Sequence, residues 1–466
     1  MASKKKTKFS TNATLFKRLK DKTAEVGIIG MGYVGLPLAL SFARAGFKVT
    51  GFDVDTQKVQ KLQRRETYIR HIPSSEVAEA ILQRDLRVTD DFRRLRDMDA
   101  ILICVPTPLD EHREPDMSFV RSTAESIGAA LRPDQLVVLE STTYPGTTEE
   151  IILGTLAKSG LRCPVAPYSV RGPKIDYDTD LQADFLMAFS PEREDPGNKN
   201  FKTYQVPKVI GGVNGPSARA AQILYAQVFD KIVPVSSTRA AEMTKLLENI
   251  YRAVNIALVN ELKCLCLRMG IDIWEVIEAA KTKPFGFTPF YPGPGLGGHC
   301  IPIDPFYLTW KAREYDFPTR FIELAGEVNT GMPEFIVSAV AEAFNARKRC
   351  LQDSKILILG VAYKKDVDDL RESPSLRIMQ LLQARGARVE YNDPFFPTLP
   401  KTRHYDFGLS SVALTPERLA RYDAVLVATD HSAYDYRDIV RHSRLVIDTR
   451  NVTRNLTENR EKIVLC

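Results

Sequence analysis

A glycine-rich turn between an apolar strand and an apolar helix constrains the fold of this chain more than any other feature. Residues 26–29 predict a short strand, residues 30–35 read Gly-Met-Gly-Tyr-Val-Gly, and an apolar helix follows to residue 45. A second predicted strand, over residues 47–52, ends at Asp53. This order of elements is typical of the dinucleotide-binding Rossmann unit, in which helices cover both faces of a parallel sheet.

The three glycines of this turn have separate tasks in such a unit. Gly30 permits the tight turn, Gly32 lets the backbone approach a pyrophosphate, and Gly35 lets helix and strand pack closely. The amides at the start of the helix, beside Tyr33 and Val34, would then face the phosphates. Residues 30–35 therefore predict a dinucleotide site.

Asp53 indicates which dinucleotide binds. A carboxylate at this place accepts hydrogen bonds from the ribose hydroxyls and repels a 2′-phosphate. Lys58 is a nearby cation that would offset part of this repulsion. On balance the sequence favours NAD over NADP as the cofactor.

Length and composition place the chain among globular proteins. Its 466 residues correspond to about three domains. Apolar residues account for 44% and charged residues for 26%, which excludes a disordered chain. No stretch approaches the roughly 18 apolar residues of a membrane span, and the N-terminus does not resemble a signal peptide. Seven scattered cysteines without paired CxxC spacing predict free thiols, no metal site and a cytoplasmic location.

The net charge of +6 is concentrated at the start of the chain. Residues 1–22 carry eight basic side chains and one acidic one, whereas the remaining 444 residues carry 56 basic and 57 acidic ones. Residues 1–24 are therefore predicted to be a basic extension, either a solvated tail or a segment that contacts an anionic membrane surface or polyanion. The rest of the chain has no basic footprint for nucleic acid.

Further apolar runs predict more strands of the same sheet, at residues 100–105, 136–140 and 185–189. Thr107, Thr142 and Thr143 follow two of these strands, at the edge where parallel sheets bind ligands.

A second unit repeats this pattern near the C-terminus. Strands are predicted at residues 355–359, 387–392 and 423–427, and residues 445–448 would close the sheet. The unit lacks GxGxxG and has Lys364 and Lys365 after Gly360 instead. It therefore either binds a different ligand through cationic contacts or is purely structural.

Residues 238–270 show apolar positions every three or four residues, without proline. They predict one helix of about 30 residues, roughly 45 Å long. Because this helix exceeds the width of a domain, we expect it to join domains and to form a homo-oligomer, at least a dimer. The predicted fold class is α/β, with two Rossmann-like doubly wound domains joined by a long central helix. The predicted domains are an NAD-binding domain over 25–225, a central helical domain over 226–335 and a C-terminal domain over 336–466.

The most unusual segment, residues 292–304, has four glycines within six residues, followed by Cys300. Such a backbone can approach a ligand closely, and a loop thiol beside polar groups can act as a nucleophile. The other six cysteines are interpreted as buried small hydrophobic residues: Cys104, Cys163, Cys264, Cys266, Cys350 and Cys466.

A nucleophilic cysteine has a specific use in a nucleotide-dependent dehydrogenase. One oxidation of an alcohol gives an aldehyde, to which the thiolate adds as a thiohemiacetal. Loss of a second hydride gives a thioester, and hydrolysis releases a carboxylate. Without the thiol, the reaction would tend to stop at the aldehyde or ketone.

Seven motifs run along the chain between residues 26 and 450: GxGYVG, VPTP, STTYPGT, SPER, Glu-Met-x-Lys-x-x-x-Asn, GGHC-x-x-x-Asp and YKKDVDDLRES. Together they resemble the UDP-glucose/GDP-mannose dehydrogenase family, whose UDP-sugar 6-dehydrogenases oxidise C6 of a UDP-hexose to a carboxylate with two NAD. The segments SPEREDPGN, AAEMTKLLENI and KKDVDDLRESPS are most similar to the bacterial UDP-N-acetylglucosamine 6-dehydrogenases. That branch supplies acidic amino sugars for surface polysaccharides such as O-antigen and capsule.

The resemblance implies roles for individual residues. Cys300 would be the nucleophile, and Asp304 would position or deprotonate the hydrolytic water. Lys245 would stabilise the alkoxide and oxyanion, and Asn249, on the same helix face, would orient sugar or water. Two further catalytic residues, for water binding and proton transfer, would be Thr143 and Glu192. The implied NAD contacts are Gly30, Gly32, Tyr33, Val34, Gly35, Asp53, Lys58, Thr107, Thr142 and Arg371. The implied contacts to the UDP-hexose are Arg193, Lys245, Asn249, Gly297, Tyr363, Lys364 and Arg450.

Two positions depart from the UDP-glucose dehydrogenases. Pro196 stands where these enzymes commonly have a second Glu, four residues after the one matching Glu192, so the role of that Glu is not carried over. His299 stands where they often have Ser, and it either tunes the thiol or makes a local hydrogen bond.

The resemblance favours UDP-N-acetylglucosamine as substrate. It leaves open UDP-N-acetylmannosamine, UDP-N-acetylgalactosamine and UDP-glucose. Two competing functional classes are a nucleotide sensor with an inactive catalytic site and a two-electron β-hydroxyacid dehydrogenase. The presence of Cys300 together with Lys245, Asn249 and Asp304 counts against the first, and Cys300 with the second nucleotide-fold unit counts against the other.

Overall fold

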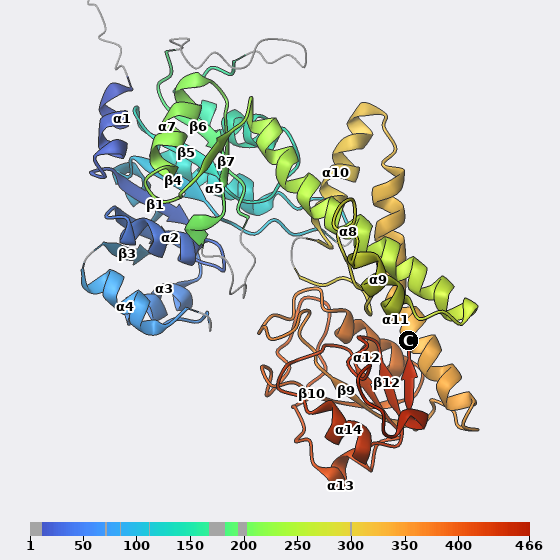
Figure 1. Ribbon diagram of the computed structural model, residues 1–466. Coiled ribbons are helices and arrows are strands. Elements are labelled where there is room, and N and C mark those ends of the chain that lie inside the picture. Colours follow the sequence, from blue (N-terminus) through green and yellow to red (C-terminus); the bar gives the residue numbers. More distant parts are fainter. Residues whose placement is uncertain are drawn as a thin grey trace, which may run out of the picture. The chain divides into compact units, whose positions relative to one another are not determined.

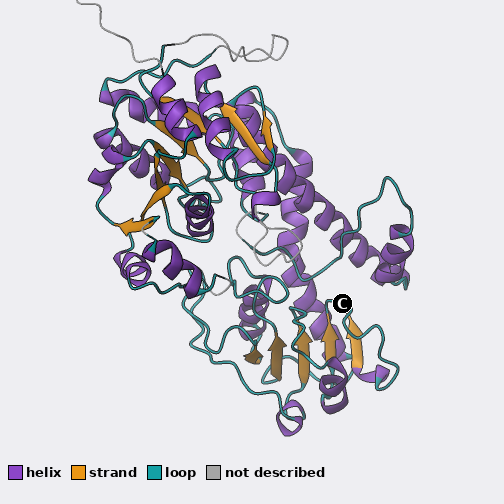
Figure 2. Cartoon of the chain, turned by 60° about the vertical axis from the view of Figure 1, so that its left-hand side comes forward, coloured by secondary structure: helices purple, strands orange, loops and turns teal. Residues whose placement is uncertain are grey.

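The computed structural model describes residues 12–69, 72–83, 85–110, 112–166, 182–193, 203–298 and 301–466. The chain forms two compact units, Met1–Glu248 and Asn249–Cys466. Figure 1 colours the first unit from blue to green and the second from yellow-green to red. Both units contain a sheet with helices packed on it, which confirms the predicted α/β class (Figure 2).

The sheet of the first unit has eight strands among the described residues, in the order β3-β2-β1-β4-β5-β6-β7-β8. Neighbouring strands are parallel except β6 and β7, which are antiparallel. The first six positions follow the Rossmann order, with the reversal between β1 and β4. The strands are β1 Glu25–Ile29, β2 Lys48–Phe52, β3 Leu86–Thr89, β4 Ala100–Ile103, β5 Leu136–Leu139, β6 Leu186–Phe189, β7 Lys208–Gly212 and β8 Ile232–Pro234.

Helices bury the apolar side chains of this sheet. Leu38 of α2 (Gly35–Arg44) and Tyr225 of α7 (Gly215–Tyr225) share one hydrophobic core with Ile28 of β1. Strands β4, β5 and β6 are buried along their whole length, as parallel strands covered on both faces are. The other helices of this unit include α3 Thr56–Gln63, α4 Ser74–Leu82, α5 Ser118–Ala130 and α6 Gly154–Leu156.

The first helix corrects the prediction of a solvated tail for residues 13–20, whereas residues 1–11 lie outside the described residues. Ala13–Lys20 form α1, whose Leu15 and Leu19 are buried in the core of the first unit. Nη2 of Arg18 lies 2.5 Å from Oδ2 of the buried Asp99. Residues 13–20 therefore belong to the folded domain, because two leucines four residues apart give this basic helix an apolar face.

The long helix α8 (Thr238–Met269) has 32 residues, as its apolar periodicity predicted. One of its faces is buried and includes Leu246, Ala253 and Ala257. A second stripe is exposed: Tyr251 by 49%, Leu258 by 54%, Leu262 by 37%, Leu265 by 51% and Met269 by 60%. These residues recur at intervals of three, four and seven, so they lie along one side of the helix. None of the helices in the described ranges has the length and apolarity that a membrane crossing requires.

The second unit has a parallel sheet of five strands among the described residues, in the order β10-β9-β11-β12-β13. The strands are β9 Lys355–Leu359, β10 Arg388–Asn392, β11 Ala424–Val427, β12 Val446–Asp448 and β13 Ile463–Leu465. The prediction that residues 445–448 close the sheet is wrong, because β13 pairs with the outer side of β12. A three-residue apolar run is too short for periodicity to distinguish it from a loop.

Helices cover both faces of the second sheet. Ile358 packs with α11 (Arg320–Asn345) and α12 (Pro374–Ala384), whereas Leu357 packs with α13 (Pro416–Leu419) and α14 (Tyr436–His442). Successive residues of β9 thus point to opposite faces. Two shorter helices precede α11: α9 Ile273–Lys281 and α10 Asp304–Ala312.

Candidate active site

Among the three glycines of the first turn, only Gly32 has free space beside it. Gly30 has a φ of +91°, and a Cβ there would lie 2.4 Å from the carbonyl oxygen of Cys104. A Cβ on Gly35 would lie 1.8 Å from the carbonyl oxygen of Gly30. A Cβ on Gly32 would meet no heavy atom within 4 Å. The fold therefore requires Gly30 and Gly35, whereas the open backbone at Gly32, before α2, fits a pyrophosphate.

Asp53 ties this turn to the end of β2. Its Oδ2 accepts a hydrogen bond of 2.9 Å from the amide of Met31, and its Oδ1 accepts one of 2.9 Å from the amide of Asp55. Lys58 Nζ lies 3.8 Å from Asp53 Oδ2. The Tyr68 hydroxyl donates to the carbonyl of Met31, and burial, with the charges of Asp53 and Asp55, raises the pKa of Tyr68. The predicted ribose-binding carboxylate is thereby held in one orientation.

The predicted threonines follow β4 and β5. Thr107 and Thr143 are buried, and Thr142 is partly exposed. The hydroxyl of Thr143 has no hydrogen-bond partner among the described residues. A buried hydroxyl without a partner costs about 1–3 kcal/mol. This atom therefore fits a residue that holds water or substrate.

Glu192 and Arg193 follow β6 and have different partners. Lys208 Nζ, at the start of β7, lies 3.5 Å from Glu192 Oε2. Arg193 Nη1 donates to the carbonyl of Pro207 at 2.7 Å, and its Nη2 lies 2.6 Å from Glu248 Oε1. The structure thus gives Arg193 partners within its own unit, and its contact with substrate stays a prediction.

Lys245 is 6% exposed and lies three residues after Glu242, on the same face of α8. Glu242 Oε1 accepts hydrogen bonds from the amide and hydroxyl of Thr148, at 2.9 and 2.7 Å, and Oε2 accepts one of 2.6 Å from the amide of Gly146. Burial raises the pKa of Glu242 to about 7, although these hydrogen bonds act in the opposite direction. Glu242 therefore connects α8 to the loop that follows β5.

In the second unit, Asn249 and Asp304 are in direct contact. Nδ2 of Asn249 donates to Oδ2 of Asp304, and Arg252 donates to Oδ1 of Asn249. Asn249 is 0% and Asp304 1% exposed. The guanidinium, the amide and the carboxylate form a chain that determines which way the amide points. Asp304, the first residue of α10, is thus fixed by α8.

The glycines of the 293–298 run pack against two of the predicted substrate residues. A Cβ on Gly297 would lie 2.5 Å from Cβ of Tyr363, and one on Gly298 would lie 3.0 Å from the Tyr363 ring. A Cβ on Gly293 would lie 2.6 Å from Nη1 of Arg450. The sequence predicted that these glycines admit a ligand. In the structure, the space beside them holds the side chains of Tyr363 and Arg450.

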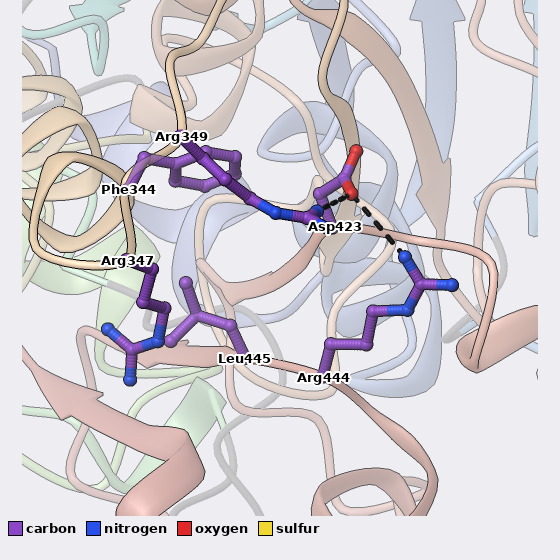
Figure 3. A pocket seen from close by; sticks show the side chains of 6 residues that line it. All are labelled: Phe344, Arg347, Arg349, Asp423, Arg444 and Leu445. Atoms are coloured by element: carbon purple, nitrogen blue, oxygen red, sulfur yellow. Dashed lines mark hydrogen bonds and ion pairs between the residues drawn. The ribbon is translucent and has the colours of Figure 1, made fainter.

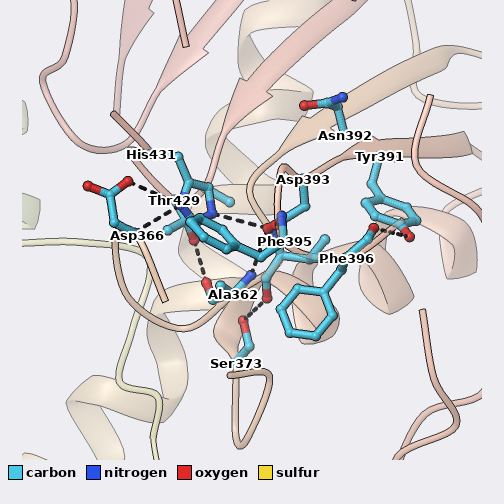
Figure 4. Close-up of polar contacts among 12 residues, drawn as sticks. Ala362, Asp366, Ser373, Tyr391, Asn392, Asp393, Phe395, Phe396, Thr429 and His431 are labelled. Atoms are coloured by element: carbon cyan, nitrogen blue, oxygen red, sulfur yellow. Dashed lines mark hydrogen bonds and ion pairs between the residues drawn. The ribbon is translucent and has the colours of Figure 1, made fainter. Parts of the chain in front are cut away.

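Asp393 holds the loop after β9 (Figure 4). Its Oδ2 accepts from the two successive amides after Gly360, at 2.7 and 3.1 Å, and lies 3.1 Å from Nε2 of His431. His431 Nδ1 accepts a hydrogen bond of 3.0 Å from the amide of Asp366, which assigns the ring proton to Nε2. These contacts close the loop that contains Tyr363.

Two other predicted ligands lie in the same segment. Lys364 is exposed. Arg371 pairs with Asp369, with 2.7 Å between Nη2 and Oδ2, and its carbonyl accepts a hydrogen bond of 2.8 Å from the amide of Gly298. A contact of Arg371 with NAD stays a prediction.

The six described cysteines differ in burial. Three are buried, as predicted: Cys104, Cys163 and Cys466. Burial raises the pKa of Cys163 to about 12 and that of Cys466 to about 11. The prediction is wrong for the other three, because Cys264 and Cys266 are only partly covered on α8 and Cys350 is exposed in the turn after α11. Cys300, His299 and Pro196 lie outside the described residues.

Figure 3 shows a pocket in the second unit, lined by Phe344, Arg347, Arg349, Asp423, Arg444 and Leu445. Asp423 pairs with Arg349 and lies 3.6 Å from Nη1 of Arg444. Arg347 and Arg349 come before β9, Asp423 immediately precedes β11, and Leu445 immediately precedes β12, so the pocket lies at the amino ends of the strands. Parallel sheets bind ligands at the carboxyl ends, and this pocket is therefore separate from the candidate active site.

Sequence reasoning assigned no role to several charged residues that contact the predicted site residues or their neighbours. They are Glu140, which pairs with Lys208 at 2.5 Å, Lys208, Glu242 and Arg252. Each acts through a partner that is distant in sequence or one helical turn away. One signal was present for Glu140 and Lys208, because each adjoins an apolar strand run. A charged side chain in a buried strand requires a partner, but the sequence does not name it.

Three sequence models of one family match the chain. The NAD binding domain of the UDP-glucose/GDP-mannose dehydrogenase family matches residues 24–229, the central domain matches 239–331, and the UDP binding domain matches 357–455. The first match contains the glycine turn and Asp53, and the last contains Tyr363 and Arg450.

Individual proteins and structures agree with this match. The chain is 34% identical to UDP-N-acetyl-D-glucosamine 6-dehydrogenase of Pseudomonas aeruginosa over 415 residues, which are 89% of this chain and 92% of that protein. It is 35% identical to UDP-N-acetyl-D-mannosamine dehydrogenase of Salmonella typhi over 442 residues, covering 92% and 99%. The structure of a UDP-D-ManNAc dehydrogenase from Pyrococcus horikoshii has a TM-score of 0.80 at 29% identity, covering 95% of this chain and 98% of that one. The chain therefore belongs to the UDP-glucose/GDP-mannose dehydrogenase family and is an NAD-dependent UDP-sugar dehydrogenase.

Proposed function

We propose that this enzyme oxidises C6 of UDP-N-acetylglucosamine to the carboxylate, in two successive NAD-dependent steps. One observation carries the choice of an acetamido sugar. The chain is 34% and 35% identical, over 415 and 442 residues, to dehydrogenases of UDP-N-acetylglucosamine and UDP-N-acetylmannosamine. The choice of the gluco sugar follows the similarity of the segments SPEREDPGN and KKDVDDLRESPS to that branch.

The first unit provides a site that fits NAD. The open backbone at Gly32 admits the pyrophosphate, and the amides of Tyr33 and Val34 face it. Asp53, held by the amides of Met31 and Asp55, accepts hydrogen bonds from the ribose hydroxyls. NAD bound there supplies the hydride acceptor for both oxidations.

Cys300 is the nucleophile in this reaction. A water molecule held by Thr143 passes the hydroxyl proton to Glu192 as the alcohol is oxidised to the aldehyde. The Cys300 thiolate then adds to the aldehyde carbon, giving a thiohemiacetal, and the second oxidation converts this into a thioester. Water cleaves the thioester and releases the carboxylate and the free thiol.

Lys245 and the Asn249–Asp304 pair support these steps. Lys245 stabilises the negative charge on the C6 oxygen in the alkoxide and in the tetrahedral intermediates. Asp304 takes a proton from the hydrolytic water, and Asn249 orients that water or the sugar. The hydrogen bond between Asn249 and Asp304 supports this assignment because it fixes the orientation of both groups.

The C-terminal unit binds the nucleotide half of the substrate. Lys364 and Arg450 pair with the diphosphate, and Tyr363 packs on the glycine loop that precedes Cys300. The packing of Gly293 on Arg450 and of Gly297 on Tyr363 supports this arrangement. Binding of UDP therefore positions the loop that leads to Cys300.

Initial rates of NADH formation with a panel of UDP-hexoses test the substrate. We expect UDP-N-acetylglucosamine to exceed UDP-glucose by roughly 10²-fold or more in kcat/KM, because the smaller sugar leaves space and polar groups unfilled. Complete conversion is expected to release two NADH per sugar. Equal rates, or a preference for UDP-glucose, would contradict the acetamido assignment and leave the dehydrogenase assignment intact.

A Cys300→Ser variant tests the covalent route. The serine oxygen can form an ester-like adduct that hydrolyses slowly, so net acid formation is expected to fall far more than NAD binding. Mass spectrometry of the variant with substrate detects the trapped adduct. Steady turnover at the wild-type rate would exclude Cys300 as the nucleophile.

UDP-N-acetylmannosamine is the second candidate substrate. The 35% identity to the Salmonella typhi enzyme, over 99% of its length, favours it. The two sugars differ only at C2, so a higher kcat/KM for the manno sugar in the same panel would replace the proposed substrate.

The proposed enzyme is a cytoplasmic homodimer that supplies an acidic amino sugar for surface polysaccharide. The exposed stripe on α8, which includes Tyr251, Leu258 and Leu265, supports the dimer because a second copy would cover it.

A further inference from the structure

Lys208 is a buried cation whose ammonium group lies near three oxygen atoms. Its side chain is 3% exposed at the start of β7. Nζ lies 2.5 Å from Glu140 Oε2, 3.3 Å from the carbonyl oxygen of Pro191 and 3.5 Å from Glu192 Oε2. Nζ donates hydrogen bonds to Glu140 and to the carbonyl of Pro191, and it forms an ion pair with Glu192.

Glu140 balances the charge of Lys208. The Glu140 side chain is 0% exposed, and its other oxygen accepts a hydrogen bond from the hydroxyl of Tyr225. The rings of Tyr225 and Phe229 lie 5.2 and 5.3 Å from the ammonium. Replacing a buried ion pair by apolar residues is often neutral or stabilising. Stability of the core is therefore a weak reason for this pair, and its position suggests another.

The pair joins the ends of two strands that lead to proposed proton-transfer residues. Glu140 immediately follows β5 and lies three residues before Thr143. Glu192 follows β6, after Pro191, whose carbonyl also accepts from Lys208. Lys208 enters from β7, which runs antiparallel to β6. The Lys208 side chain thus contacts the turn after β6 at two points, the backbone carbonyl of Pro191 and the carboxylate of Glu192.

We propose that Lys208 is a positioning residue that holds Glu192 in place for proton transfer, and that Glu140 compensates the charge of Lys208. This inference rests on the proposed function, in which Glu192 accepts a proton. Lys208 acts through Glu192 and does not itself contact the substrate. The contact between Lys208 and Glu192 is what distinguishes this role from a purely structural ion pair.

The test is a double-mutant cycle with a charge-neutral pair. Lys208→Met together with Glu140→Gln removes both charges at nearly constant volume, so Glu140 is not left as a fully buried carboxylate without its cation. In the wild-type background we expect kcat to fall about 10- to 100-fold, because a displaced Glu192 loses part of the roughly 10²- to 10⁴-fold that a positioned general base contributes. The KM for NAD should stay within about twofold of wild type. In a Glu192→Gln background, the same pair of substitutions should cause no further fall, because both act on one group.

The other outcomes overturn the proposal. Equal fold-changes in the two backgrounds would mean that Lys208 acts independently of Glu192. A wild-type kcat for Glu192→Gln alone would remove the group through which Lys208 is proposed to act. Tyr225→Phe is the matched control, because it removes a partner of Glu140 and keeps the cation. We expect it to lower the melting temperature without lowering kcat.

A crystal structure of the Lys208→Met/Glu140→Gln variant tests the placement without any turnover. The Glu192 carboxylate is expected to leave its position when the cation is absent. A carboxylate that stays in place would overturn the positioning role. Failure of the proposed function would be seen in a different experiment: the wild-type enzyme would release no NADH from any UDP-N-acetylhexosamine.

Discussion

Asp53 and Asp393 make the same connection in the two units. Each follows the second strand of its unit, and its Oδ2 accepts a hydrogen bond from the amide after a glycine turn, at 2.9 Å for Asp53 and 2.7 Å for Asp393. Their other partners differ. Nζ of Lys58 lies 3.8 Å from Oδ2 of Asp53, whereas Nε2 of His431 lies 3.1 Å from Oδ2 of Asp393. One backbone arrangement thus supports an open dinucleotide turn in the first unit and a closed loop in the second.

Substitution of Asp53 is expected to change the choice of cofactor. Asp53→Asn removes the charge that repels a 2′-phosphate, so the KM for NAD should rise and discrimination against NADP should relax. Steady-state kinetics with both cofactors measure the ratio of kcat/KM for NAD to kcat/KM for NADP. Asp393→Asn is the matched control, and it should leave the KM for NAD unchanged. If this ratio were unaltered in Asp53→Asn, another residue would have to distinguish the ribose hydroxyl of NAD from the 2′-phosphate of NADP.

Gly32 and Gly35 are expected to respond differently to alanine. Gly32→Ala should keep the melting temperature within a few degrees of wild type, because its Cβ meets no atom within 4 Å, and should raise the KM for NAD. Gly35→Ala should lower the melting temperature, because its Cβ would lie 1.8 Å from a carbonyl oxygen. Thermal unfolding without cofactor separates the two effects. A large loss of stability in Gly32→Ala would contradict the assignment of that space to the pyrophosphate.

Glu242 is expected to make the first unit less stable as the pH rises. Burial raises its pKa to about 7, so the folded state keeps a proton that the unfolded state loses near pH 4.5. This contribution is complete below about pH 4.5 and is lost between about pH 4.5 and 7, at up to about 1.4 kcal/mol per pH unit. Glu242→Gln should flatten this part of the profile, as measured by urea unfolding at several pH values. Glu150→Gln, at an exposed carboxylate, is the control and should keep the wild-type slope.

The exposed stripe of α8 is expected to form a homodimer interface. Leu258→Glu together with Leu265→Glu places charges on this stripe, where both side chains are more than half exposed in the single chain. The pair should therefore disrupt association while leaving each unit folded. Light scattering at micromolar protein measures the molar mass in solution, and circular dichroism checks that the variant is folded. An active wild-type monomer under these conditions would contradict the dimer.

Parts of the site could be predicted because their signal is local. The glycine spacing of residues 30–35 and the acid at Asp53 specify a dinucleotide turn within 24 residues. The spacing of Lys245 and Asn249 places them on one helical face. The packing of Gly297 and Gly298 on Tyr363 could not be predicted, because a glycine run is compatible with many neighbours and only the folded chain supplies one.

The sequence by itself determined the two Rossmann-like units, the long helix α8, the preference for NAD and the family. These depend on periodicity and on motifs whose physical reasons lie within a few residues, such as backbone freedom at a glycine. The tertiary structure alone decided that α1 is folded, that β13 closes the second sheet, and that Lys208 meets Glu140 and Glu192. The Lys208–Glu140 pair is separated by 68 residues. Helix α1 and strand β13 are short elements, and distant segments bury the leucines of α1 and partly cover the apolar residues of β13. Whether a buried charge has a partner is determined by the packing of whole strands and helices, which no short sequence window contains.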